Sequence, residues 1–498
     1  MNSTDNIQQS SEETLSKKVV RGGVWIFSLR VINRSIGFIR TIILTSLLSP
    51  KDFGLIGIAL LSMATLETFS QIGFQASLIQ KKEDISPYLN TIWTVSAIRG
   101  LIISLILYFA APLIADFFDS QESCLIIKVL ALSAFITGLK NSGLVYFQKD
   151  LKFNRLFSYE FSITLFDFAV SLTLAFLLKN AWALVWATLL ASLFRTAMSH
   201  IIIKHPVSVS IDWHRFRDVF AFGKWVFLSG IIIFLFVHGD DILVGKILGL
   251  SALGLYQMAY LISNLSATEI THVISQVSFP AYSRIQDDIP KLSGAYLKVL
   301  TVTALLSFPI AGITYSLSPS FIKIFMGDRW IPIIPAIQIL CIYGLTRAIG
   351  ATMGPILYST GMPKVQAKLS GIQLALLILI IYPLTDKFGI SGTSLSVVTA
   401  HMLGLILITA ETRKILNFSI GTFLRHMSIP FLSTLITIIF LVLFEINFPL
   451  DRYPFIFAGT AVFSVMLYIS SAYFFDSRKG IIRSYLNEIL SNLGMLKI

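Results

Sequence analysis

Long runs of apolar residues recur along this chain, and short polar or turn-forming groups separate them. We find fourteen runs of about 20 residues or more, each long enough to span a bilayer of roughly 30 Å as a helix. Groups such as Lys179-Asn180 and Gly361-Met362-Pro363 favour turns between them. The separation is narrowest near residues 180, 250 and 388, where two runs almost fuse. The predicted spans are 20–48, 53–79, 91–116, 125–147, 156–179, 181–203, 223–249, 251–280, 293–317, 331–357, 369–387, 389–411, 427–446 and 454–475.

The composition supports a polytopic membrane protein. Of the 498 residues, 55% are hydrophobic and 13% are charged, about half of the roughly 25% charged residues of a soluble protein. The stretch from Met1 to Ser16 is polar and mildly acidic, so we expect no cleaved signal peptide. The two cysteines, Cys124 and Cys341, belong to different spans and show no Cys/His metal-ligand spacing. We therefore expect neither a disulfide nor a bound metal.

The net charge is +12, and the Lys and Arg residues are distributed according to the predicted topology. If the N-terminus lies in the cytoplasm, the inner segments carry 23 Lys and Arg residues and the outer segments carry 7. This asymmetry obeys the positive-inside rule and places both termini in the cytoplasm. The basic balance therefore indicates membrane topology, and we expect no nucleic-acid partner.

The chain also repeats itself after 200 residues. The first two spans match the seventh and eighth without a gap. Six spans separate the two copies. Because six is an even number, we expect parallel repeats related by an axis along the membrane normal. Two such halves usually place a substrate site between them, near the midplane. The matched identities include Gly23, Trp25, Phe27, Ile42, Leu48, Gly54 and Leu55 with Gly223, Trp225, Phe227, Ile242, Leu248, Gly254 and Leu255.

Several basic side chains lie well inside the predicted spans, where a cation costs several kcal/mol unless it faces water or a partner. At 1.5 Å per residue, five of them lie about 12–15 Å from the cytoplasmic end of their spans. A sixth, Arg34, lies one turn beyond Arg30 on the same face. These residues predict a cationic lumen that binds an anionic substrate. The candidate substrate-binding residues are Arg30, Arg34, Arg99, Lys140, Arg195 and Arg347.

The alternative interpretation is that each cation forms a structural ion pair with an acid in the membrane. The available acids are Glu67, Glu160, Asp167, Glu269 and the Asp240-Asp241 pair.

Asp240 and Asp241 lie toward the outer half of the seventh span and are candidates for ion coupling. A buried carboxylate can bind Na⁺ through its oxygens or take up H⁺. The other interpretation makes Asp240 a counter-ion for Arg40, which occupies the matching repeat position. His238, His272 and His401 are scattered over different spans and form no ligand pattern. We expect them to be hydrogen-bonded core residues.

Several motifs, in their order and spacing, resemble the polysaccharide transporter family of the multidrug/oligosaccharidyl-lipid/polysaccharide flippase superfamily. Within this family, the chain resembles the lipopolysaccharide and colanic acid exporters most. The similarity extends over nearly the whole chain. The motifs are Leu48-Ser-Pro-Lys-Asp-Phe-Gly-Leu55, Gln71-Ile-Gly-Phe-Gln-Ala-Ser-Leu-Ile-Gln-Lys81, Ala111-Pro-Leu-Ile-Ala-Asp-Phe-Phe118, Gln148-Lys-Asp-Leu-Lys-Phe-Asn-Arg155 leading to Glu160, and Ser359-Thr-Gly-Met-Pro-Lys-Val365.

The resemblance implies an all-α fold with about fourteen transmembrane helices, arranged as two pseudo-symmetric six-helix lobes plus two C-terminal helices. Relatives use basic lumen residues for the pyrophosphate of their substrate, and some have a cation site around an acid of the seventh helix, the helix that carries Asp240 and Asp241. The implied segments are an N-terminal tail (1–19), an N-lobe (20–204), a linker (205–222), a C-lobe (223–412), helices 13 and 14 (413–475) and a C-terminal tail (476–498).

The implied activity is transport rather than enzyme catalysis. The expected substrate is an undecaprenyl-pyrophosphate-linked oligosaccharide, an exopolysaccharide or O-antigen repeat unit, moved across the bacterial cytoplasmic membrane by rocker-switch alternating access. No cofactor is expected beyond Na⁺ or H⁺ as a coupling ion. Besides membrane lipids, a polysaccharide polymerase or glycosyltransferases are candidate partners. The alternatives are a multidrug exporter of the same superfamily, a polytopic glycan polymerase or glycosyltransferase, and a non-transporting scaffold.

Overall fold

Helices form every secondary-structure element of the described chain. The computed structural model describes residues 29–70, 85–150, 152–203, 207–210, 212–476 and 480 and, within residues 213–278, the side chains of 234, 237–264, 271, 274 and 278. A helix over residues 29–47 comes first. It is followed by α2 (Pro50–Phe69), α4 (Ser86–Phe117), α5 (Gln121–Gly138), η1 (Ser142–Leu144), α6 (Val145–Lys149), α7 (Phe153–Leu178), α8 (Trp182–Ile202) and α9 (Trp213–Ser283).

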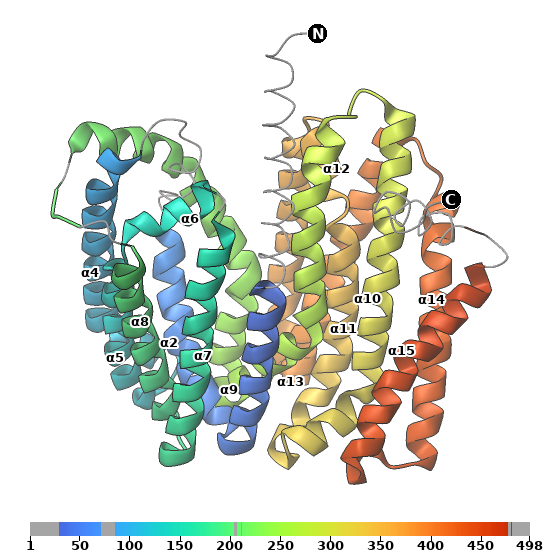
Figure 1. The fold of residues 1–498 in the computed structure, drawn as a ribbon. Helices are drawn as coiled ribbons and strands as arrows, with labels where there is room; N and C mark the ends of the chain where they lie inside the picture. Colours follow the sequence, from blue (N-terminus) through green and yellow to red (C-terminus); the bar gives the residue numbers. More distant parts are fainter. Residues whose placement is uncertain are drawn as a thin grey trace. The chain divides into compact units, whose positions relative to one another are not determined.

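The remaining helices follow α9 without a long connection (Figure 1). Residues 1–254 and 255–498 each form a compact unit, and α9 passes from the first unit into the second. The predicted linker at 205–222 lies earlier in the chain than this division, and the assignment of two lobes stays a prediction. The later helices are α10 (Ile289–Phe325), η2 (Asp328–Ile333), α11 (Ile334–Gly350), α12 (Gly354–Ser359), α13 (Pro363–Leu416), α14 (Ile420–Asn447), η3 (Leu450–Arg452) and α15 (Pro454–Asp476).

Each of the fourteen predicted spans contains helix. Eleven of the described helices are long and apolar enough to cross a membrane. Two of these, α9 and α13, consist of two helices joined at Gly249 and Gly389, whose φ values are 81° and 59°. Glycine adopts such left-handed backbone without a steric penalty. The narrow breaks predicted near 250 and 388 are confirmed, and with the helix at residues 29–47 they account for all fourteen spans.

The start of α2 shows what one of the sequence motifs does. Ser49 and Asp52 form a capping box, in which the Ser49 hydroxyl accepts from the Asp52 amide and the Asp52 carboxylate accepts from the Ser49 amide at 2.9 Å. The second carboxylate oxygen of Asp52 accepts from the backbone amide of Ala181, 2.9 Å away at the start of α8. A cap of this kind contributes about 1 kcal/mol. The motif therefore caps the beginning of α2 and fastens it to the start of α8.

Glycines allow α4 and α5 to cross closely. A Cβ on Gly100 would lie 2.8 Å from the carbonyl oxygen of Ala134, and one on Gly138 would lie 2.7 Å from that of Ser96. Small residues permit such approaches between helices in a membrane, where packing replaces the hydrophobic effect as the main attraction. The crossing also brings together the segments that carry Arg99 and Lys140. In Figure 1, α4, α5 and α8 run side by side in the first unit.

A reciprocal contact joins α2 to the middle of α9. A Cβ on Gly54 would lie 1.9 Å from the carbonyl oxygen of Leu250, and a Cβ on Gly254 would lie 2.0 Å from that of Pro50. These four residues are related in pairs by the shift of 200 residues found in the sequence. Residues related by this shift therefore make reciprocal contacts.

In the second unit, α10 packs against α11, α14 and α15. Gly312 of α10 accommodates Thr434, whose methyl group would lie 2.4 Å from a Cβ at that position. The phenol of Tyr468 donates to the carbonyl of Leu305 at 3.0 Å, which fastens α15 to α10. The two C-terminal helices therefore belong to the core of this unit.

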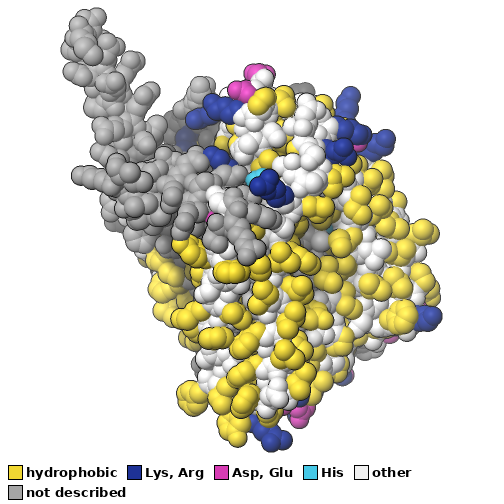
Figure 2. Space-filling model, turned by 90° about the vertical axis from the view of Figure 1, so that its right-hand side faces the viewer, with side chains coloured by type: hydrophobic (Ala, Val, Ile, Leu, Met, Phe, Trp, Pro, Cys, Tyr) yellow, Lys and Arg dark blue, Asp and Glu magenta, His cyan; other side chains and the backbone are white. Residues whose placement is uncertain are grey.

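The outer surface of the second unit is apolar between charged ends. Figure 2 shows one face on which hydrophobic side chains cover the middle, while Lys and Arg gather near the upper and lower ends. Exposed apolar side chains of α14 and α15 include Leu443, Met466 and Ile469. A broad exposed apolar surface between charged ends is typical of helices that face lipid.

Candidate functional site

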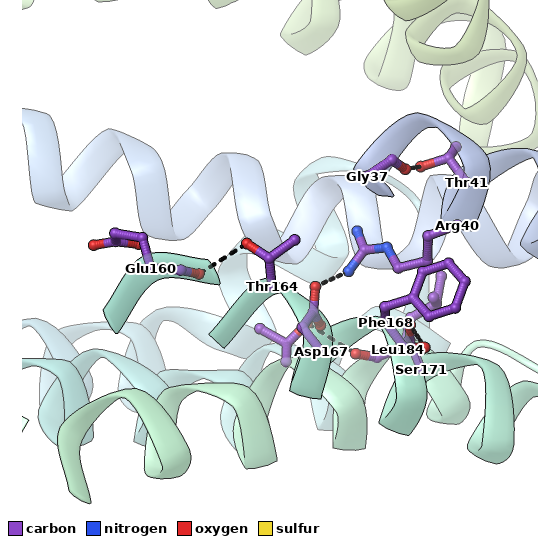
Figure 3. Close-up of polar contacts among 10 residues, drawn as sticks. Gly37, Arg40, Thr41, Glu160, Thr164, Asp167, Phe168, Ser171 and Leu184 are labelled. Carbon is purple, nitrogen blue, oxygen red and sulfur yellow. Dashed lines mark hydrogen bonds and ion pairs between the residues drawn. The ribbon is translucent and has the colours of Figure 1, made fainter. Parts of the chain in front are cut away.

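Two acids of α7 lie on one face and meet cations from neighbouring helices. Glu160 and Asp167 are seven residues apart, and Thr164 lies between them on the same face (Figure 3). Asp167 forms an ion pair with Arg40 of the helix at residues 29–47. The interpretation of Asp240 as the counter-ion of Arg40 is therefore wrong, because the partner comes from α7 instead of α9.

Arg195 of α8 pairs with the other acid of α7. Its Nη1 atom lies 3.1 and 3.4 Å from the two carboxylate oxygens of Glu160. The phenol of Tyr159 donates to the backbone carbonyl of Arg195 at 3.0 Å, which fixes the same turn of α8. Arg195 thus has the ion pair that the alternative interpretation describes, and its role in substrate binding stays a prediction.

Lys140 lies at an interruption of the fourth span. The sequence predicted one continuous helix at 125–147, but α5 ends at Gly138 and the short helices η1 and α6 follow. The prediction failed because Asn141, Ser142 and Gly143 break the helix inside an apolar run. Non-helical backbone at membrane depth is tolerated only where protein covers it or where it lines a water-filled cavity.

Side chains from α4 and α8 satisfy the backbone at this break. The indole of Trp93 and the imidazole of His200 both lie 3.0 Å from the carbonyl oxygen of Leu139. Thr196 donates to the carbonyl of Ile136 at 2.9 Å, and the hydroxyl of Ser199 accepts from the Asn141 amide at 2.9 Å. The interruption is therefore built into the fold by specific partners on both neighbouring helices.

Three of the predicted cations meet around this break. Lys140 lies within electrostatic reach of Arg99, Arg195, Glu67 and Glu160. Arg99 also donates to the carbonyl of Ser70 at 3.3 Å. Three cations thus share two carboxylates, and the cluster retains an excess positive charge. This part of the predicted site is assembled within one unit.

Arg347 also lies beside a helix break, in the tenth span. It lies near the end of α11, which stops at Gly350 before the short helix α12 begins at Gly354. The fourth and tenth spans are six spans apart, as the repeat requires. Each has a break followed by a short helix, α6 or α12, which lies on the cytoplasmic side by the predicted topology (Figure 1). In sequence, each break also has a cation beside it, Lys140 or Arg347. Broken helices are where transporters of repeated architecture place their substrate sites.

The surroundings of Arg347 differ from those of Arg195. Its Nη1 atom donates to the phenol oxygen of Tyr260 at 3.4 Å. No carboxylate of the described residues forms an ion pair with it, and the side chain of Glu269 lies outside the described part. Arg347 is thus a cation inside a membrane span whose described partners are neutral.

The other predicted residues are placed less completely. Arg30 and Arg34 are half-buried on the helix at residues 29–47. Asp240 is buried, and its carboxylate accepts from the Asp241 amide at 3.0 Å. Asp241 lies 3.4 Å from Nδ1 of His238. A single layer of cations shared by both units, and ion coupling through the two aspartates, stay predictions. The motif Gln71 to Lys81 lies outside the described residues.

No cluster of three His, Cys, Asp or Glu side chains suited to a metal occurs in the part of the chain that the structure describes.

Sequence and fold comparisons place these features among known proteins. Residues 43–335 match the family described as "Polysaccharide biosynthesis protein". The chain is similar to the lipopolysaccharide biosynthesis protein WzxC of Escherichia coli strain K12, with 25% identity over 434 residues, which cover 86% of this chain and 87% of that protein. Its fold resembles the lipid II flippase MurJ in an inward closed conformation, with a TM-score of 0.72, 16% identity and coverage of 91% of this chain and 99% of that one. An inward-facing multidrug resistance transporter of the MATE family gives a TM-score of 0.63 at 16% identity, over 77% of this chain and 94% of that one.

These matches confirm the all-α polytopic fold and the family predicted from the motifs. The two solved structures share the fold, but one is a lipid II flippase and the other a multidrug resistance transporter, so the fold alone does not decide between a glycan-related substrate and a drug. The family match covers more than half of the sequence. This chain is a multi-pass membrane protein that belongs to the polysaccharide biosynthesis protein family.

Proposed function

We propose that this protein is a flippase for an undecaprenyl-pyrophosphate-linked oligosaccharide, an exopolysaccharide or O-antigen repeat unit. It acts in the bacterial cytoplasmic membrane with both termini in the cytoplasm. The relative WzxC is named for lipopolysaccharide biosynthesis, and the fold is shared with a protein named as a lipid II flippase. A polymerase or glycosyltransferases that supply and consume this substrate are the expected partners.

The observation that carries this proposal is the environment of Arg347. A guanidinium inside a membrane span costs several kcal/mol unless an anion or water compensates it. The described partner of Arg347 is a neutral phenol. A pyrophosphate supplies negative charge that the described partners of Arg347 do not, and its oxygens match the planar fork of the guanidinium.

The sign of the charge argues against the alternative of a multidrug exporter. A site for organic cations needs an excess of acids, whereas the cluster around Lys140 has three cations and two carboxylates. The two solved structures reported above, which share the fold, are named as a flippase and a transporter, and this supports transport over the alternative of an enzyme. A scaffold gains nothing from cations placed beside two helix breaks.

The proposed mechanism is rocker-switch alternating access. The basic residues beside the helix breaks replace the hydration of the pyrophosphate with charge-assisted hydrogen bonds while the site faces inward. Moving an anion out of a negative interior is favoured by about 2.3 kcal/mol per charge per 100 mV. The membrane potential therefore contributes to export, and Asp240 and Asp241 are the candidates for any additional coupling to Na⁺ or H⁺.

Substitution of Arg347 tests the function. A charge-assisted contact contributes about 1.5–3 kcal/mol, so Arg347→Ala should lower transport by roughly tenfold or more in proteoliposomes supplied with a fluorescent polyprenyl-pyrophosphate oligosaccharide. Arg347→Lys should retain part of the activity, since it keeps the charge and loses the bidentate fork.

Arg413→Ala is the matched control, because Arg413 is exposed near the end of α13. It should transport at the wild-type rate, and both alanine variants should reach wild-type levels in the membrane. Normal transport by Arg347→Ala would contradict the proposal, and so would wild-type protein that moves drug-like cations in preference to the labelled oligosaccharide.

A further inference from the structure

His401 of α13 lies against the same face of α11 as Arg347. Its Cε1 atom is 3.9 Å from the position that a Cβ on Gly350 would occupy. Its ring meets the ring of Tyr343 edge-on, with 5.0 Å between centroids and 88° between planes. Tyr343, Arg347 and Gly350 follow each other at spacings of four and three residues, so they share one face of the helix. The imidazole therefore lies beside the turn that carries the guanidinium, within electrostatic reach of it.

The Nδ1 atom of His401 is buried and has no hydrogen-bond partner among the described residues. The other described histidines each have one: Thr301 for His426 at 2.9 Å, Asp241 for His238 and the Leu139 carbonyl for His200. Leaving a buried polar atom without a partner costs about 1–3 kcal/mol. A ligand that supplies the partner would remove this cost.

Tyr260 closes the third side of the cluster. Its phenol oxygen accepts from Arg347, and its ring lies 5.9 Å from the ring of Tyr343. The four side chains come from α9, α11 and α13 of the second unit. Tyr343 is buried between Tyr260 and His401 and has ring contacts with both, so it holds them on either side of the Arg347 turn.

We propose that Arg347 and His401 form one phosphate-binding subsite, with Tyr260 positioning the guanidinium. Arg347 supplies the charge and two donors in a plane, and the imidazole hydrogen-bonds to a further phosphate oxygen. The ligand is the pyrophosphate of a polyprenyl-linked substrate. This inference rests on the proposed function and adds His401 to the site, a residue that the sequence pattern assigned to the core.

A binding measurement with farnesyl pyrophosphate tests the subsite in the full-length protein purified in detergent. Farnesyl pyrophosphate should raise the melting temperature of the wild type, and above its dissociation constant the rise should grow with the logarithm of its concentration. Both Arg347→Ala and His401→Met should weaken its binding, the first by tenfold or more and the second by about three- to tenfold. His401→Gln keeps a side-chain donor and should bind within threefold of the wild type. Methionine fills a similar volume without an N–H group. The affinity that His401→Met loses therefore reports on the hydrogen bond.

The double variant Arg347→Ala with His401→Met should lose less affinity for farnesyl pyrophosphate than the product of the fold-losses of the two single variants, because both groups contact one ligand. His426→Met is the matched control, since His426 lies on α14 and already has Thr301 as its partner. It should bind farnesyl pyrophosphate like the wild type. Tyr260→Phe removes only the phenol oxygen and should weaken binding in the wild type but not in Arg347→Ala.

The outcomes separate this inference from the proposed function. If Arg347→Ala loses affinity and His401→Met does not, His401 is a packing residue and the inference alone is wrong. If the wild type does not bind farnesyl pyrophosphate at all, the proposed function fails with it. If phosphatidylglycerol protects the wild type as well as farnesyl pyrophosphate does, the cluster holds a lipid headgroup and the assignment to the substrate is overturned.

Discussion

Arg195 and Arg347 carry the same charge inside membrane spans, but their described partners differ. Arg195 is compensated by Glu160, which lies 3.1 Å away, whereas the partner of Arg347 among the described residues is a phenol. Removing one member of a buried pair leaves an uncompensated charge, which costs far more than removing both. Both side chains of the Arg195 pair are partly exposed, at 37% and 28%, so solvent reduces this cost. The pair can therefore be tested by comparing single and double neutral variants.

Glu160→Gln should lower the melting temperature and the amount of protein in the membrane, because it leaves Arg195 beside Lys140 without its carboxylate. The double variant Glu160→Gln with Arg195→Gln should recover most of the melting temperature and most of the amount in the membrane. It should also transport near the wild-type rate. Thermal unfolding and proteoliposome transport measure the two effects. A double variant that is stable but inactive would mean that Arg195 itself contacts the substrate, contrary to its structural assignment.

At the scale of helices, two glycine positions show how closely the repeats approach. The methyl group of an alanine at Gly54 or Gly254 would meet a backbone carbonyl at about 2 Å, far inside ordinary contact distance. Backbone cannot move aside as a flexible side chain does, so overpacking here should cost on the order of 1–3 kcal/mol or force the helices apart. The two positions are equivalent in the repeat, so their responses should be alike.

Gly54→Ala and Gly254→Ala should each lower the melting temperature by several degrees, and by similar amounts. Gly37→Ala is the control, since Gly37 lies in a helix and nothing would lie within 4 Å of its Cβ. That variant should melt at or slightly above the wild-type temperature, because alanine favours helix. Thermal unfolding in detergent decides the matter, and equal stability of all three variants would show that α2 and α9 are not in close contact in the membrane.

The helices themselves could be predicted from the sequence, because each apolar run exceeds the thickness of a bilayer. Their interruptions were not predicted, because an average over about 20 residues conceals three turn-forming residues such as Asn141, Ser142 and Gly143. Gly350 and the Gly354-Pro355 pair gave the same signal in the tenth span. Reading glycine and proline positions inside the runs would have located both breaks. Those breaks matter most, because Lys140 and Arg347 lie beside them.

At the scale of the whole molecule, the sequence shows a repeat and an unequal distribution of Lys and Arg between the inner and outer segments. Contacts in the structure bear on the repeat. The shift of 200 residues predicted that equivalent residues would be related by symmetry, and the exchange between Gly54 and Gly254 agrees with it. Which cations share one cavity could not be predicted in full, because sequence depth ignores acids on neighbouring helices. Glu160, which pairs with Arg195, is such an acid. The inference about His401 depends on contacts between α11 and α13, which the sequence does not show.

The charge asymmetry makes a separate prediction about orientation, because parallel repeats require an even number of crossings between equivalent points. Reporter fusions after Ser120, Ser251 and Asp451 should therefore report the outer side, and fusions after Lys152, His214 and Lys364 the cytoplasm. Alkaline phosphatase and green fluorescent protein fusions measure the two sides independently. The fusion after His214 is decisive, since it lies between the two copies of the repeat. An outer location there would make the copies antiparallel, and Lys140 and Arg347 would then lie near opposite faces of the membrane instead of at one depth.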